Sequence, residues 1–341
     1  GEIEITAQII DSNLGDSHII SWNIPTRYQG EISANQQKVF IDPSNLILQQ
    51  GDRDIISLSV KISDSGLGEL SVTEFIHLPI LATQPRLTTS DTDRDGITDV
   101  VESFVDDDLD GLPAFMDTSD VPYIQPLHVN AAITRFIETE PGLHLSLGKY
   151  ARQQLSDGMM LSEQEILATG HIPADSINHQ DEYFDFEIRQ ITPVGRSVST
   201  VIPLQENLPE FAAYRKFTVA QGWQDFVEDA NNTLASALAV NDVCPPPHSE
   251  IYQAGLTQGD NCLRLTIKDG GINDADGIEN GSIDDPGGIA IIAKTEIAKG
   301  IDPVKSSSGG AFFVNLIFLL LILGWRGLYA LSTTAGRGGN R

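Results

Sequence analysis

Basic residues are scarce in this chain of 341 residues. It contains 21 Lys and Arg against 48 Asp and Glu, which gives a formal net charge of −27. Proteins that bind nucleic acid neutralise its phosphates with clustered Lys and Arg, so this composition argues against a nucleic-acid partner. The excess of carboxylates favours bound divalent cations or a salty exterior instead.

Catalytic motifs are also lacking. The sequence contains no H-E-x-x-H, G-x-S-x-G, phosphate-loop or dinucleotide-binding pattern. The seven His are scattered, and the one local group, His171 and His179 with Asp181 and Asp185, is better explained by surface or core histidines. The sequence therefore predicts a protein that is not an enzyme.

Cysteine is limited to Cys244 and Cys262, which stand 18 positions apart. In an exported chain, such a pair most simply forms one disulfide. A metal site is disfavoured because only His248 lies nearby, and two or three more ligands would be needed. Two free buried thiols are the alternative.

Apolar residues make up 40% of the chain, which is enough for two or three cores of a mainly β protein. Residues 1–85 alternate apolar and polar side chains with turn residues between the runs, so we expect an Ig-like or cadherin-like β-sandwich. The stretch Ile5–Trp22 loosely resembles the first hairpin of bacterial Ig-like and polycystic-kidney-disease-like repeats, which are usually spacers. The predicted strands are Glu2–Ile10, His18–Trp22, Asp54–Ser63 and Leu70–His77.

An acidic block over residues 86–120 carries the strongest chemical signal. From residue 91 it reads D-T-D-R-D-G-I-T-D-V-V-E, with alternating carboxylates and a glycine in the sixth place. This is the spacing of a calcium-binding loop, because Ca²⁺ takes about six to eight oxygen ligands and the glycine permits a sharp turn. The predicted ligands are the side chains of Asp91, Asp93, Asp95, Asp99 and Glu102 and the main-chain carbonyl of Ile97.

A second copy of the pattern follows 15 positions later. Its predicted ligands are Asp106, Asp108, Asp110 and Asp117 with the carbonyl of Leu112, and Ala114 stands where a further acid is expected. The tandem D-x-D-x-D-G units, followed by Leu112-Pro113, resemble thrombospondin type 3 repeats. That resemblance implies Ca²⁺ at the core of a stiff connector between domains. A solvated acidic linker is the alternative.

A third group of oxygen-bearing side chains lies between residues 269 and 286. Asp274, Asp276 and Asn280 are candidate ligands for a further Ca²⁺, although Ile272 occupies the place of the first acid. Asx turns that join two strands would explain the same residues.

Residues 121–300 are expected to form a second β-rich domain, with another sandwich as the favoured arrangement. Two stretches look helical, Ser162–Thr169 and Phe226–Leu238. The predicted strands are Leu143–Leu147, Tyr183–Arg189, Val198–Leu204, Cys262–Lys268 and Gly288–Ala293.

The order of landmarks in this region is more specific than its strand pattern. Phe184-Asp-Phe-Glu is followed by Trp223-Gln-Asp-Phe, Cys244-Pro, Cys262-Leu-Arg-Leu and Asp285-Pro-Gly-Gly. This order is similar to that of the bacterial choice-of-anchor U domain. The resemblance implies a domain without assigned catalytic activity, placed just before a C-terminal sorting signal.

Residues 301–341 combine a small-residue linker, Gly309-Gly310, an apolar run over Ala311–Leu331 and a basic end. The apolar run predicts a single transmembrane helix, and the arginines place the C-terminus inside. Together these features resemble the GlyGly-CTERM sorting signal. The resemblance implies an inner-membrane-anchored precursor in a Gram-negative bacterium, cleavage near the glycines by a rhombosortase-type protease, and transfer to the cell surface or medium. An uncleaved anchor is the alternative.

The sequence as a whole predicts an exported, non-catalytic calcium-binding protein with a spacer or adhesion role toward a glycan or protein on another surface. Because the chain opens with Gly1 and its first Met is Met116, we expect it to be the C-terminal part of a longer protein. The alternative is that it is the anchoring region of a large exported hydrolase whose active site lies upstream.

Overall fold

A computed structural model describes residues 3–9, 17–28, 31–33, 36–42, 53–65, 71–81, 86–106, 108, 110–128, 135–154, 156 and 158–292. The predicted membrane span and the Gly309-Gly310 processing site lie outside these residues. Within them, no helix combines the length and the apolar character needed to cross a membrane. The described part is mainly β, as the sequence predicted, with several antiparallel sheets and very little helix.

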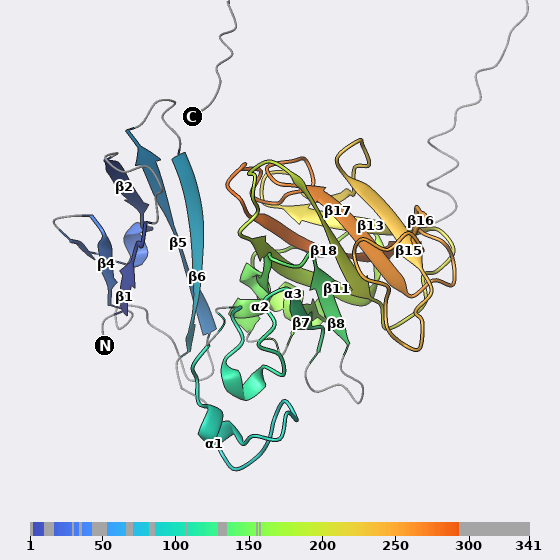
Figure 1. The fold of residues 1–341 in the computed structure, drawn as a ribbon, viewed down its shortest axis with the longest axis horizontal. Helices are drawn as coiled ribbons and strands as arrows, with labels where there is room; N and C mark the ends of the chain where they lie inside the picture. The colour runs from blue at the N-terminus through green and yellow to red at the C-terminus, as the bar shows by residue number, and fades with distance from the viewer. Residues whose placement is uncertain are drawn as a thin grey trace, which may run out of the picture. The chain divides into compact units, whose positions relative to one another are not determined.

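The N-terminal region contains two antiparallel three-stranded sheets (Figure 1). Val39 and Ile41 from one sheet share a core with Ile56 and Leu58 from the other. Tyr28 completes this core, and its hydroxyl donates a hydrogen bond to the Ile55 carbonyl at 2.9 Å. The first sheet runs in the order β1 (Ile3–Thr6), β4 (Lys38–Ile41), β3 (Glu31–Ile32), and the second in the order β2 (His18–Asn23), β5 (Arg53–Asp64), β6 (Ser71–Leu81).

Each of the four strands predicted here is present, as β1, β2, β5 and β6. The alternation of apolar and polar side chains predicts them because successive residues of a strand point to opposite faces. The Ig-like or cadherin-like character of the region stays a prediction.

The acidic block has little regular structure. It contains the short helix α1 (Asp99–Glu102) and a single 3₁₀ turn, Ala114–Met116. The remainder is held by turns whose hydrogen bonds use aspartate side chains.

The C-terminal β-rich region is built from two larger antiparallel sheets that share one core. Phe184 and Ile289 enter this core from one sheet, and Leu263 and Leu265 enter it from the other. One sheet has the order β10 (Met160–Leu161), β11 (Asn178–Arg189), β18 (Ile283–Ile291), β13 (Ala212–Thr218), β14 (Gly222–Asp225), with β9 (His144–Leu147) also paired to β11. The other has the order β16 (Gln253–Ala254), β15 (Thr233–Ala237), β17 (Cys262–Lys268), β12 (Ser197–Pro203), β8 (Phe136–Thr139), β7 (Ile124–Pro126).

Helices are few and short in this region. The helix α2 (Lys149–Gln154) follows β9 directly. The predicted helix Ser162–Thr169 is confirmed as α3 (Glu163–Ala168). It begins with a capping box, in which the Ser162 hydroxyl accepts the Glu165 amide and the Glu165 carboxylate accepts the Ser162 amide.

The predicted helix Phe226–Leu238 is wrong, because this stretch ends in the strand β15. The Asp229 carboxylate accepts hydrogen bonds from the amides of Asn231 and Asn232 at 2.7 and 2.9 Å, which forms a side-chain turn. Such a turn competes with helical hydrogen bonding, so the stretch does not form a helix. The residues after it continue as a strand of the second sheet.

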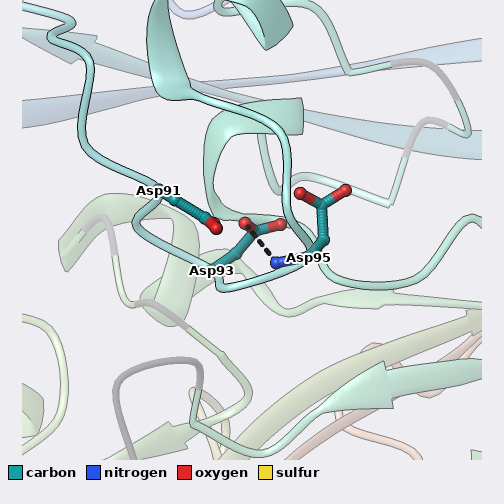
Figure 2. Close-up of side chains that lie close together, drawn as sticks. All are labelled: Asp91, Asp93 and Asp95. Atoms are coloured by element: carbon teal, nitrogen blue, oxygen red, sulfur yellow. Dashed lines mark hydrogen bonds between the residues drawn. The ribbon is translucent and has the colours of Figure 1, made fainter.

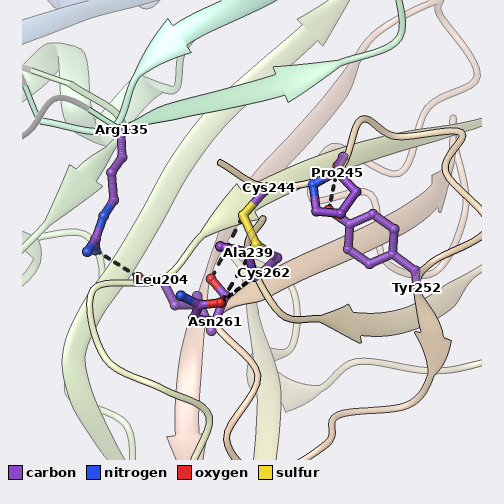
Figure 3. Close-up of a disulfide and its surroundings, with 8 residues drawn as sticks. All are labelled: Arg135, Leu204, Ala239, Cys244, Pro245, Tyr252, Asn261 and Cys262. Atoms are coloured by element: carbon purple, nitrogen blue, oxygen red, sulfur yellow. Dashed lines mark hydrogen bonds between the residues drawn. A yellow bond between two sulfur atoms is a disulfide. The ribbon is translucent and has the colours of Figure 1, made fainter. Parts of the chain in front are cut away.

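The predicted disulfide between Cys244 and Cys262 is present and joins the loop after β15 to the start of β17 (Figure 3). Cys262 lies in a small separate core with Ala235, Ala237 and Tyr252. The Tyr252 hydroxyl donates to the Pro245 carbonyl at 2.6 Å, which fixes the loop beside the bond. A disulfide is typical of an extracellular or periplasmic location.

Replacing both cysteines, as Cys244→Ala with Cys262→Ala, is expected to lower the free energy of unfolding by about 3 kcal/mol, because the unfolded chain regains the entropy of a closed loop of this length. Urea denaturation of the variant and the wild type measures the difference. Dithiothreitol should reproduce the loss in the wild type and leave the variant unchanged. Equal stabilities of the oxidised wild type and the variant would contradict this role.

Candidate metal centre

The two acidic loops share two hydrogen bonds from main-chain amides to aspartate side chains, and a glycine with positive φ in the sixth place. In each loop, the first aspartate accepts the amide of the glycine in the sixth place, and the third aspartate accepts the amide two residues later. Both glycines have positive φ angles, +99° for Gly96 and +96° for Gly111. The paired hydrogen bonds are Gly96 N to Asp91 Oδ2 (3.1 Å) with Gly111 N to Asp106 Oδ2 (3.0 Å), and Ile97 N to Asp95 Oδ1 (2.6 Å) with Leu112 N to Asp110 Oδ1 (2.6 Å).

Each loop brings three carboxylates together. One donor oxygen from each of Asp91, Asp93 and Asp95 lies within 4.8 Å of the other two, and the same holds for Asp106, Asp108 and Asp110. Figure 2 shows the carboxylate of Asp93 between those of its two neighbours in the first loop. Both triads could hold a metal ion, in agreement with the sequence prediction.

Several carboxylate oxygens in the loops are buried without a hydrogen-bond partner among the described residues. Asp93 is 2% exposed and Asp110 is 0% exposed, yet Oδ2 of each lacks a donor. The same is true of Oδ2 of Asp108 and Oε2 of Glu102. Buried polar atoms are nearly always hydrogen-bonded in folded proteins, so these oxygens could serve as ligands for a cation.

The electrostatics of the loops point the same way. Burial, added to the neighbouring carboxylates, raises the pKa of Asp93 to about 6 and the pKa of Asp110 to about 8. Burial and the charge of the first triad raise the pKa of Glu102 to about 7. Each carboxylate is therefore poorly stabilised in its charged form by the protein alone, and a bound cation would supply the missing positive charge.

The closing acids of both loops lie within electrostatic range of their triads. The negative charges of Asp93, Asp95 and Asp91 contribute to the raised pKa of Glu102. Likewise, burial raises the pKa of Asp117 to about 7, and the negative charges of Asp108 and Asp106 contribute to this shift.

Asp99, the ninth-place acid of the first loop, is predicted to be a calcium ligand, and in the structure its carboxylate accepts hydrogen bonds from the protein. Both oxygens of Asp99 accept hydrogen bonds from Thr92, from its amide at 2.9 Å and its hydroxyl at 3.0 Å. This contact closes the loop upon itself. Ile97 is exposed whereas Leu112 is buried, and the ligand role of their carbonyls stays a prediction.

The third group of candidate ligands is hydrogen-bonded within the protein. Asp274 accepts the amides of Gly270 and Asp284 at 2.8 and 3.0 Å. Asp276 accepts the Ile278 amide and the side-chain amide of Asn280 at 2.8 and 2.9 Å. The contact between Asp276 and Ile278 is that of an Asx turn, whereas Asp274 joins two amides that are distant from each other in sequence. A third Ca²⁺ at this place stays a prediction.

One residue that sequence reasoning missed is Arg152, on α2. Its side chain donates to the main-chain carbonyl of Asp110 at 3.1 Å, across 42 positions of sequence. No local pattern identifies such a contact, because it depends on how α2 packs against the second loop.

Comparison with known proteins gives no further guidance. No family model matches the chain, and neither a curated protein nor a solved structure is significantly similar to it. The chemistry of the loops therefore carries the functional argument.

Substituting the two loop glycines should separate backbone strain from packing. Gly96→Ala is expected to cost about 1 kcal/mol, because an L-residue is strained at positive φ while no atom lies within 4 Å of the added Cβ. Gly111→Ala should cost clearly more, since its Cβ would overlap the Arg152 guanidinium, which is buried and held by hydrogen bonds to the carbonyls of Leu147 and Asp110. Urea denaturation in chelator compares the two variants. Equal losses would show that the guanidinium does not lie against Gly111.

Proposed function

We propose that this chain is a calcium-binding, non-catalytic module of an exported protein, in which each acidic loop holds one Ca²⁺. The observation that carries the proposal is the pair of oxygen triads with matching hydrogen bonds from main-chain amides, in which buried carboxylate oxygens of Asp93 and Asp110 lack any donor among the described residues. A cation is the simplest group that satisfies several such oxygens at once.

The donor set favours calcium over other metals. The predicted ligands are carboxylate and carbonyl oxygens, without His or Cys in either loop. Hard oxygen ligands in number suit Ca²⁺, whereas Zn²⁺ and Cu²⁺ favour nitrogen or sulfur, and Mg²⁺ demands near-ideal octahedral geometry and retains water.

The wider role follows from the resemblances in the sequence. The disulfide supports export, and the two-sheet N-terminal region suits an Ig-like spacer. With the second domain resembling choice-of-anchor U and the tail resembling GlyGly-CTERM, we assign the chain a spacer or adhesion role at the surface of a Gram-negative bacterium. Its ligand there would be a glycan or protein on another surface.

Calorimetric titration of the full chain in mild detergent should detect about two Ca²⁺ per molecule. Asp93→Asn and Asp110→Asn should each remove one, because each replaces a charged ligand while preserving the volume of the side chain. Asp242→Asn serves as the control, since Asp242 is an exposed acid outside both loops. An absence of binding heat in the wild type would refute calcium binding.

The tail is tested in a bacterium that carries a rhombosortase-type protease. Replacing Gly309 and Gly310 with Leu should hold the protein in the inner membrane, because the protease would lose its small-residue cleavage site. Cell fractionation measures the distribution. Normal release of this variant would remove the sorting role and leave the calcium proposal standing.

A further inference from the structure

We propose that the second loop is a calcium-dependent clamp on the C-terminal β-rich region, in which Arg152 is the positioning residue, whereas calcium in the first loop does not act directly on β9 and α2. This inference rests on the proposed calcium binding. It concerns what the bound ion does to the rest of the protein, and the two loops provide an internal comparison.

The clamp is centred on the main-chain carbonyl of Asp110. This carbonyl accepts the Leu147 amide at 2.7 Å and Nη2 of Arg152 at 3.1 Å. Nε of Arg152 also donates to the Leu147 carbonyl at 2.8 Å. One guanidinium therefore joins the loop to the last residue of β9.

Arg152 reaches this position from a largely buried place on α2. Its guanidinium lies so close to Gly111 that a side chain there would overlap it. The residue that permits the turn of the loop thus also provides the surface on which the arginine rests. At the corresponding place in the first loop, no atom lies within 4 Å of a Cβ added to Gly96.

Two further contacts extend the clamp into the fold. Leu112 is buried in the main hydrophobic core, together with Leu147. Leu147 pairs with Phe186 of β11, a strand that pairs in turn with β18. An ion that fixes the carboxylate of Asp110 therefore also fixes a backbone unit on which β9 and α2 depend.

The first loop makes no hydrogen bond to β9 or α2 within the described part of the chain. Most of its hydrogen bonds join residues between Thr88 and Val105 to one another, as in Asp99 N to the Ser90 carbonyl (2.8 Å). Its segment contacts the second loop, because the Ala114 amide donates to the Val105 carbonyl at 2.6 Å and Phe104 packs edge-on against Phe115. Asp95 is exposed whereas Asp110, in the same place of the second loop, is buried. Calcium in the first loop should therefore order that segment, which among the described residues has no direct hydrogen bond through which to act on β9 or α2.

Hydrogen–deuterium exchange of the full chain in mild detergent, with calcium chloride or with chelator, tests the clamp. In the wild type, calcium should slow amide exchange about fivefold or more in peptides that cover β9 and α2, a factor typical of coupling between sites. Asp110→Asn should abolish this protection, because it removes a charged ligand and keeps the main-chain carbonyl. Asp95→Asn, its matched counterpart, should retain it.

The variant Arg152→Lys separates calcium binding from the effect of the bound ion on β9. Lysine keeps the positive charge but cannot donate to both carbonyls in the geometry of the guanidinium. Two Ca²⁺ should still bind, while the calcium-dependent protection of β9 falls. If this variant does not fold, the pair of Asn variants decides alone.

The outcomes are distinguishable. Binding of two Ca²⁺ to the wild type with equal protection of β9 in both Asn variants would overturn the clamp and leave calcium binding intact. An Asp110→Asn variant that binds as many ions as the wild type would remove the second site, and the clamp with it.

Discussion

Mutual repulsion of closely packed carboxylates is the constraint on which the centre of this protein depends. Each loop places three aspartates within 4.8 Å of one another and adds a closing acid. Without a cation, the charge and the burial of these groups oppose the folded loop, as the raised pKa values of Asp93 and Asp110 show. A bound divalent ion would convert the same arrangement into a stabilising one.

Other buried acids in the protein show what a carboxylate looks like when the fold satisfies it. The Asp269 carboxylate accepts the amides of Gly195, Asn280 and Gly281 at 2.8 to 3.1 Å. Asp185 accepts two amides at the start of α2, those of Tyr150 and Ala151. These acids organise loops through protein donors alone. Oδ2 of Asp93, Asp108 and Asp110 lacks such a donor in the described residues, which leaves these oxygens available to a metal ion.

Features that depend on neighbouring residues could be predicted from the sequence, and those that depend on tertiary contacts could not. The spacing of Asp91, Asp93 and Asp95 determines the first triad because one tight turn brings them together. Alternation similarly predicted β17. The apolar spacing of 226–238 was misleading, since the Asp229 side chain forms a turn there. The contact between Arg152 and Asp110 spans two elements that the sequence does not connect.

The distance in sequence between the second loop and its partners sets an order of assembly. The Asp110 carbonyl can gain both of its donors, the Leu147 amide and the Arg152 guanidinium, only after Arg152, 42 positions downstream, is available. In a chain that emerges N-terminus first, the first loop can close on an ion as soon as its own residues are available. The second can be completed only when β9 and α2 have followed. Calcium binding to the second loop would then be a late step, which stabilises the β-rich region after β9 and α2 have formed.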